Sequence, residues 1–264
     1  MATTSRVDPG PLRPGGRSKL RLDRGPLRWW LIVVGALAIH FSWERFAVGT
    51  GLVVLGAALH LGTKGVHRQN HRLATTGPYR FTRNPFYLAN LIAEVGLLVV
   101  IGVWWVAAVY LVAWAWIYHR QIRGEERTLE GLFGDGYRQY RQRVAPLVPL
   151  PWRVLPRDRA GGRAFYWRNP NVLRQRAVER ALRLGSYPVL LLLAAVLWRD
   201  GWRSLFVIGS PAGWSACGFV GLNLLGTLST VLLRRAACPE AAAAGLRRAS
   251  GNDGAAAAAT TARP

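Results

Sequence analysis

The chain has 264 residues, of which 35 are lysine or arginine and 13 are aspartate or glutamate, so its formal net charge is +22. Hydrophobic residues make up 51% of the chain, too large a fraction for a disordered protein, and they are gathered in long uncharged runs. These properties argue against a soluble single domain, and a membrane protein with basic flanks has both of them. Arginine, alanine and glycine are abundant together, as GC-rich coding produces, so the charge alone is weak evidence for nucleic-acid binding.

Residues 1–28 combine basic side chains with prolines and glycines and cannot build a core. They predict a disordered basic arm that rests on anionic lipid. A cleaved secretory signal is the alternative, because the small residues Ala36 and Ala38 follow an apolar stretch. The basic segment before that stretch is far longer than an ordinary signal peptide allows, which favours the arm.

Apolar runs predict six membrane spans. The first extends from Trp29 to Phe46 and the second from Val48 to Gly62, with a tight turn around Glu44 and Arg45. The run from Phe86 to Tyr118 would measure roughly 50 Å as one helix, well beyond a ~30 Å hydrocarbon core. We therefore predict a second helical hairpin that turns near Gly102.

The remaining apolar runs, Leu184–Trp198 and Ala212–Leu233, predict the last two spans. Basic residues concentrate in alternate connections, which predicts that both termini and the two large basic loops are cytoplasmic. The chain is thus expected to be an all-α, polytopic membrane bundle with a cytoplasmic amphipathic helix, in the inner membrane of a bacterium. The predicted parts are an arm (1–28), a four-span core with a motif helix (29–151), a basic linker (152–183), two further spans (184–235) and an Ala-rich tail (236–264).

The first segment whose residues could form a functional site is Thr76–Leu88. Gly77-Pro78 predicts a turn, and Asn84-Pro85 is typical of a helix N-cap followed by proline at the first helical position. The positive end of that helix would lie beside Arg80 and Arg83, an arrangement that attracts a carboxylate or a phosphate. The alternative is a capped helix whose arginines contact lipid headgroups.

The second segment is Arg123–Tyr137, which carries an adjacent acidic pair. On a helix Glu126 falls within the apolar stripe of Ile122, Leu129 and Phe133, and Glu125 aligns with Leu132, so both carboxylates should point to the apolar side. Ionised carboxylates taken out of water need cationic partners. The candidates are Arg80, Arg83, Arg120 and Arg123, and a purely structural ion-pair network remains the alternative.

In order and spacing, the stretch from about Val48 to Pro151 resembles the isoprenylcysteine carboxyl methyltransferase and phospholipid methyltransferase group of integral membrane enzymes. Members commonly have Arg-His-Pro where this chain has Arg83-Asn84-Pro85. The remaining matches are Glu125-Glu126, Phe133-Gly134, Tyr137, Tyr140 and Val144.

The resemblance implies S-adenosylmethionine bound at the cytoplasmic face and a lipophilic acceptor that arrives from the bilayer. The cofactor carboxylate would suit the start of the helix at Pro85 with Arg80 or Arg83, and its ammonium, sulfonium and ribose would suit Glu125 and Glu126. The predicted catalytic residues are Arg83, Asn84 and Glu126. The predicted cofactor-binding residues are Tyr79, Arg80, Arg83, Asn84, Pro85, Tyr87, Leu88, Glu125 and Glu126.

Asparagine can hold a hydrogen bond but cannot titrate near neutral pH, so Asn84 can replace a histidine that orients the cofactor but not one that takes a proton. Glu94 lies inside a span, where a charge is costly, and should face the bundle. Glu94 and Asn90 are therefore predicted to line the acceptor cavity; a neutral Glu94 bonded to Asn90 is the alternative.

Two other functions remain open at the level of sequence. Sterol-type membrane reductases, which use NADPH, have a similar pattern, but they usually show Arg-Asp-Glu where this chain has Gly124-Glu125-Glu126. A non-catalytic membrane protein with the same core is the third hypothesis. Expected partners are membrane lipids and the lipophilic acceptor, without nucleic acid. No metal site is expected, since Cys217 and Cys238 lack the spacing of a zinc site.

Overall fold

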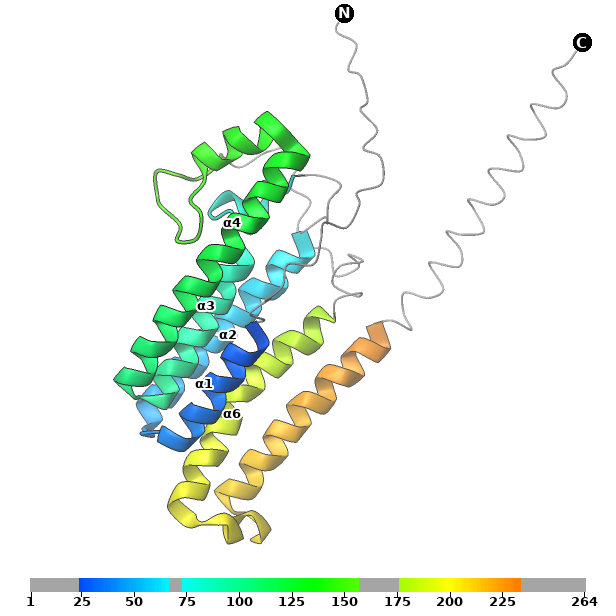
Figure 1. Ribbon diagram of the computed structural model, residues 1–264. Helices are drawn as coiled ribbons and strands as arrows, with labels where there is room; N and C mark the ends of the chain where they lie inside the picture. Colours follow the sequence, from blue (N-terminus) through cyan, green and yellow to red (C-terminus); the bar gives the residue numbers. More distant parts are fainter. Residues whose placement is uncertain (1–23, 67–72, 157–175, 234–264) are drawn as a thin grey trace, which may run out of the picture.

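The computed structural model describes residues 24–66, 73–156 and 176–233 (Figure 1). Within these ranges the chain is helical and has no strand, only an isolated bridge between Thr82 and Ala145. The α-helices are α1 (Arg24–Ala38), α2 (Trp43–Val66), α3 (Pro85–Ile101), α4 (Trp104–Arg143), α6 (Ala177–Asp200) and a last helix, Pro211–Leu233. Two 3-10 helices are η1 (Gly77–Arg80) and η2 (Trp202–Phe206). The predicted all-α membrane bundle is confirmed.

Three described helices, α2, α6 and Pro211–Leu233, are long and apolar enough to cross a membrane. The helices α1 and α3 are apolar but shorter. With 40 residues rising by about 1.5 Å each, α4 is longer than the ~30 Å hydrocarbon core, so its carboxyl-terminal part must lie outside it.

The first hairpin turns earlier than predicted. The helix α1 begins at Arg24, so the last residues of the predicted arm are helical, and the turn occupies residues 39–42 rather than Glu44 and Arg45. Ser42 begins the second helix, because its Oγ accepts a hydrogen bond from the backbone N–H of Arg45 at 3.3 Å. Residues 1–23 and 234–264 of the predicted arm and tail lie outside the described ranges.

The predicted hairpin at Gly102 is present. Gly102 has φ 70°, a left-handed conformation that ends α3, and its N–H donates to the carbonyl of Leu98. The first hairpin holds this turn: the N–H of His40 donates to the carbonyl of Ile101 at 2.9 Å, and Arg45 Nη1 donates to that of Gly102 at 3.2 Å. The two turns therefore form one end of the bundle.

The predicted amphipathic motif helix is continuous with the fourth span. The backbone stays helical through Glu126 and breaks at Gly134, where φ is 51° and ψ is −126°. Figure 1 shows α4 extending beyond α3 and bending back at its end. Good helix formers follow the apolar part without proline, so nothing in the backbone ends the helix at the membrane boundary.

The helices α2 and α3 are packed backbone against backbone through glycine and alanine. A Cβ built on Gly49 would lie 2.5 Å from the carbonyl oxygen of Gly96, and one on Gly56 would lie 2.6 Å from that of Ala89. Small residues let membrane helices approach this closely. This rigid pair holds the start of α3 in place.

The last two helices are longer than the predicted spans. The helix α6 begins at Ala177 rather than Leu184, inside the predicted basic linker, because Glu179 pairs with Arg183 one turn later at 2.8 Å. Asn223 of the last helix donates to Ser186 Oγ at 3.1 Å and joins the two helices. In Figure 1 this hairpin lies on the opposite side of α1 and α2 from α4.

Candidate active site

The backbone at the start of α3 is as predicted, but the Asn84 side chain is not. Pro85 is the first helical residue, and the carbonyl of Asn84 accepts hydrogen bonds from the N–H groups of Tyr87 and Leu88 at 3.0 and 3.1 Å. The Asn84 side chain makes no capping bond. Its Nδ2 donates instead to the carbonyl of Pro146 at 2.8 Å, so the predicted side-chain cap is wrong.

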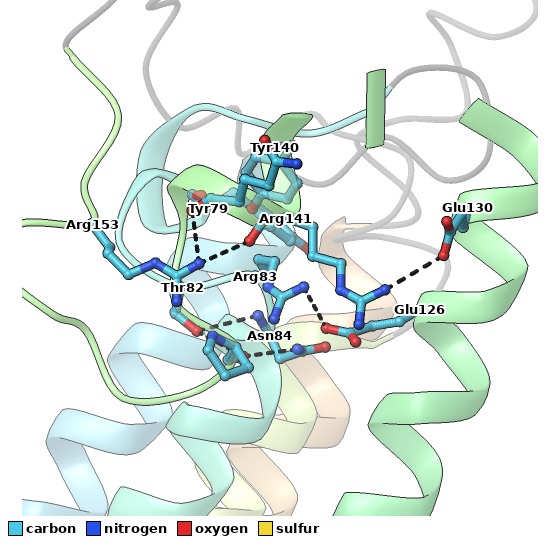
Figure 2. Close-up of polar contacts among 11 residues, drawn as sticks. Tyr79, Thr82, Arg83, Asn84, Glu126, Glu130, Tyr140, Arg141 and Arg153 are labelled. Atoms are coloured by element: carbon cyan, nitrogen blue, oxygen red, sulfur yellow. Dashed lines mark hydrogen bonds and ion pairs between the residues drawn. The ribbon is translucent and has the colours of Figure 1, made fainter. Parts of the chain in front are cut away.

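The segment before α3 is fastened to the segment after α4. The N–H of Arg83 donates to the carbonyl of Ala145 at 2.9 Å, and the hydroxyl of Thr82 donates to that of Pro146 at 3.3 Å. The Tyr140 hydroxyl donates to the carbonyl of buried Tyr79 at 2.8 Å. Residues 77–84 are thereby held against the kinked end of α4 (Figure 2).

Arg80 has a structural partner. Its Nε and Nη2 both donate to the carbonyl of Leu155, at 3.0 and 2.8 Å, and the N–H of Leu155 donates back to the Arg80 carbonyl at 3.2 Å. The guanidinium that the sequence predicted for a cofactor carboxylate thus ties two loops together. The sequence contained no local signal for this contact, because 75 residues separate the partners.

Glu126 meets Arg83, one of the four arginines that the sequence left open as its partner. Arg83 Nη1 lies 2.9 Å from Glu126 Oε1, and the two side chains are only 8% and 12% exposed. Figure 2 shows them pointing toward one another, Arg83 from the start of α3 and Glu126 from α4. The two opposite charges lie close together but are poorly aligned for a hydrogen bond. Arg83 Nε, Arg83 Nη1 and Glu126 Oε1 have no hydrogen-bond partner among the described residues.

The two acidic neighbours have different environments. Glu126 is partly buried, whereas Glu125 is exposed, so the prediction that both carboxylates face the apolar side is wrong for Glu125. It lies at the rim of α4, where Glu125 Oε1 accepts a short hydrogen bond from the hydroxyl of buried Tyr87 on α3. A second link therefore joins the start of α3 to the acidic pair. Leu88, the residue of α3 after Tyr87, is partly exposed.

A small apolar core of Tyr137, Tyr140 and Val144 supports this end of the molecule. Burial raises the pKa of Tyr137 to about 12, with a further increase from the charge of Glu126 and an opposing decrease from Arg83. Burial also raises the pKa of Tyr79 and that of Tyr140. These hydroxyls stay protonated at physiological pH and act as neutral hydrogen-bonding groups.

These pKa shifts predict a loss of stability in strong base. Between pH 10 and 12 the unfolded chain releases the Tyr137 proton while the folded chain keeps it, so the free energy of unfolding should fall as the pH rises through this window. Tyr137→Phe should flatten that fall, measured by denaturant unfolding from pH 8 to 12. An unchanged slope in the variant would show that Tyr137 does not contribute.

The hydrogen bond from Asn84 to Pro146 predicts a measurable loss of stability when Asn84 is replaced by a residue of similar size. Asn84→Asp replaces the Nδ2 donor by an oxygen that faces the Pro146 carbonyl, and should lower the free energy of unfolding by about 1–3 kcal/mol at pH 8. Asn84→His, which keeps an N–H donor, is the matched variant and should lose less. Equal stability of the aspartate variant and the parent would contradict this role.

Glu94 and Asn90 lie inside the bundle, apart from the Arg83–Glu126 pair. Glu94 is 2% exposed, and its Oε1 accepts bonds from Arg28 Nε and Nη2 at 3.0 and 2.6 Å. Arg28 Nη2 also lies 3.5 Å from Asn90 Oδ1, so an arginine bridges the two residues, in place of the direct bond between them that was the alternative to a cavity lining. The sequence analysis missed Arg28 because it placed this residue in the arm.

Residues 50–131 match the model of the isoprenylcysteine carboxyl methyltransferase family. The chain is 31% identical over 156 residues to the cobalt-zinc-cadmium resistance protein CzcN of Cupriavidus metallidurans, covering 53% of this chain and 72% of that protein. No solved structure matches the chain.

Two of the relatives named as methyltransferases are protein-S-isoprenylcysteine O-methyltransferases. The protein-S-isoprenylcysteine O-methyltransferase of Schizosaccharomyces pombe is 34% identical over 83 residues, 31% of this chain and 35% of that protein. Protein-S-isoprenylcysteine O-methyltransferase B of Arabidopsis thaliana is 30% identical over 123 residues, 46% of this chain and 61% of that protein. The residues that match the family model contain the start of α3 and the acidic pair of α4. With its apolar helices, the chain is an integral membrane protein that belongs to the isoprenylcysteine carboxyl methyltransferase family.

Proposed function

We propose that this protein transfers a methyl group from S-adenosylmethionine to a lipophilic or amphiphilic acceptor at the cytoplasmic face of a bacterial inner membrane. The observation that carries the proposal is the pair of Arg83 and Glu126. In this pair a cation and an anion meet at the positive end of α3, and both are nearly buried. Each has polar atoms that lack hydrogen-bond partners among the described residues.

These unpartnered atoms fit the amino-acid end of the cofactor, which is a zwitterion. A buried guanidinium whose N–H groups make no aligned hydrogen bond suits a carboxylate, and a buried carboxylate whose paired oxygen makes none suits an ammonium. The first turn of α3 adds the positive end of the helix dipole on the carboxylate side. A ligand with both charges would replace one misaligned ion pair by two aligned ones.

The neighbouring residues would contact the rest of the cofactor or hold the Arg83 loop in position. Glu125, oriented by the Tyr87 hydroxyl, is placed to accept hydrogen bonds from a ribose diol or to face a sulfonium charge. Asn84 and Arg80 donate from their side chains and Tyr79 accepts at its carbonyl, so that their contacts with residues 140–155 keep the Arg83 loop in place. Asn84 is therefore proposed as a positioning residue that does not titrate during the reaction.

When bound, the cofactor supplies a methyl group on a positively charged sulfur. In-line transfer of that group needs little acid–base assistance once the acceptor atom is held about 3–3.5 Å away. The protein contributes position, charge and exclusion of water. Because the site is at the end of a bundle of apolar helices, an acceptor dissolved in the bilayer reaches it without crossing water.

The test is binding and group transfer with labelled cofactor. Purified protein in detergent should bind S-adenosylmethionine in calorimetry, and membranes that contain the protein should incorporate the methyl label into an organic-soluble molecule. Binding of a reduced nicotinamide in preference to the sulfonium cofactor would select a reductase instead. Binding of neither would leave a non-catalytic member of the family.

A further inference from the structure

One face of α4 carries an apolar stripe that continues into a row of arginines. Residues three or four positions apart lie on the same face of a helix, and in Figure 1 α4 runs along one edge of the bundle. The exposed residues on this face are, in order, Trp105, Val109, Val112, Trp116, Arg120, Arg123 and Arg127. We call the first four the apolar stripe and the last three the arginine row. The face thus changes from apolar to cationic within one turn.

The change takes place at the membrane boundary. Residues 104–118 of α4 have no charged side chain, so this part of the helix lies in the hydrocarbon core, where the apolar stripe contacts acyl chains. The Arg120 guanidinium lies over the Trp116 ring, 5.1 Å from its centroid. Tryptophan is enriched at the membrane–water interface, and long basic side chains reach the same level. The arginine row therefore begins at the lipid headgroups.

The side chains of the arginine row lean back toward the membrane. In an α-helix the Cα–Cβ bonds tilt toward the amino terminus, and α4 begins at the opposite end of the bundle, beside the turn at Gly102. Arg120 shows this direction, because its guanidinium reaches the ring one turn earlier in the chain. At a rise of about 1.5 Å per residue, Arg123 begins only about 5 Å further out than Arg120, and Arg127 about 10 Å further out. Side chains of this length bring all three charges toward one headgroup layer.

The arginine row has no counter-ion within the part of the chain that the structure describes. The two carboxylates on the same turns are directed to α3, where Glu126 pairs with Arg83 and Glu125 accepts from the Tyr87 hydroxyl. Each of the three arginines is exposed, and none forms an ion pair or a side-chain hydrogen bond with a described residue. Like charges three and four residues apart repel one another on a helix. An anion that contacts several of them removes this repulsion.

We propose that the arginine row binds the phosphate of an anionic phospholipid, whose acyl chains lie along the apolar stripe. Guanidinium groups donate charge-assisted hydrogen bonds to phosphate oxygens, and anionic lipids attract basic residues at the membrane surface. The apolar stripe favours a lipid over a free phosphate ion, because only a lipid fills both parts of the face. A phosphatidylcholine headgroup adds a positive charge that the arginines repel. This site is separate from the Arg83–Glu126 pair and does not depend on methyl transfer.

The fluorescence of Trp116 can report which lipid lies on this face. The full-length chain is reconstituted in phosphatidylcholine vesicles that contain either phosphatidylglycerol or phosphatidylcholine with brominated acyl chains, which quench nearby tryptophans. The Trp116 signal is the difference between the chain and its Trp116→Phe variant. Quenching over a series of mole fractions gives the association constant of each lipid relative to the other. Phosphatidylglycerol should be favoured at least threefold, and equal association constants would overturn the proposal.

Two double variants separate a local site from the effect of net charge. Arg120→Gln with Arg123→Gln should abolish the preference for phosphatidylglycerol at Trp116. Arg199→Gln with Arg203→Gln removes the same charge at the opposite end of the bundle, where Arg203 also lies over a tryptophan, 5.9 Å from the Trp202 centroid. This control should keep the preference of the parent. All four arginines are exposed, so both variants should keep the helical content of the parent in circular dichroism.

The remaining outcomes contradict the arginine row as the binding site. A preference that persists without Arg120 and Arg123 would show that other residues attract the lipid. A preference lost equally in both double variants would show that net charge, rather than this face of α4, selects it.

Discussion

Replacing Glu126 by glutamine should weaken the binding of S-adenosylmethionine at least tenfold, about 1.4 kcal/mol. Glutamine keeps the shape and an oxygen but loses the charge that an ammonium needs. It also leaves the Arg83 guanidinium, 8% exposed, without its counter-ion. Arg83→Ala should have an effect of at least the same size, since it removes the partner of the cofactor carboxylate.

The matched control is Glu130→Gln, one turn further along α4. Glu130 pairs with Arg138 at 2.9 Å and with Arg141 at 3.5 Å, but these arginines are half exposed or more, and the ion pairs lie beyond the proposed site. Calorimetry should give cofactor affinities within twofold for this variant and the parent. Unchanged affinity in both Glu126→Gln and Arg83→Ala would remove the site assignment.

A double variant tests whether the two residues act together. Since Arg83 and Glu126 lie 2.9 Å apart and would hold opposite ends of one zwitterion, the loss in Arg83→Ala, Glu126→Gln should be smaller than the sum of the single losses. The double variant also removes the unpaired buried charge that each single variant creates. Strict additivity would indicate that the residues do not share a ligand.

Gly49→Ala should destabilise the bundle by about 1–3 kcal/mol or prevent folding, the largest expected effect outside the site. The new Cβ would lie 2.5 Å from the carbonyl oxygen of Gly96 and 3.0 Å from the backbone nitrogen of Val100. Backbone atoms cannot rotate away as a side chain does, so α2 and α3 would have to separate. The start of α3 would move with them.

Gly51→Ala is the control on the same helix. Nothing lies within 4 Å of a Cβ at Gly51, so the substitution meets open space and should be neutral or raise stability by up to about 1 kcal/mol through helix propensity. Unfolding of both variants in mixed micelles, followed by circular dichroism during a titration with dodecyl sulfate, compares them directly. Similar midpoints would show that the α2–α3 contact adapts to a methyl group.

The sequence predicted correctly those structural elements that depend only on residues close together in the chain. The all-α membrane class follows from apolar runs of helical length, the start of α3 from Asn84-Pro85, and the second hairpin from Gly102, which adopts φ 70°. The two motifs also predicted that the acidic pair would meet an arginine, with Arg83 as one of four candidates. The resemblance to a family of methyltransferases rested on the same spacing, and the comparisons confirmed it.

Contacts between distant segments decided what each polar side chain does. Only the tertiary structure shows that Arg80 donates to the Leu155 carbonyl, that Asn84 binds Pro146 rather than capping its helix, and that Arg28 neutralises Glu94. Each of these partners is more than 60 residues away in sequence. A sequence carries the charge and reach of a side chain, but which of several arginines meets a given carboxylate depends on how the helices pack. Glycine contacts set that packing only between α2 and α3.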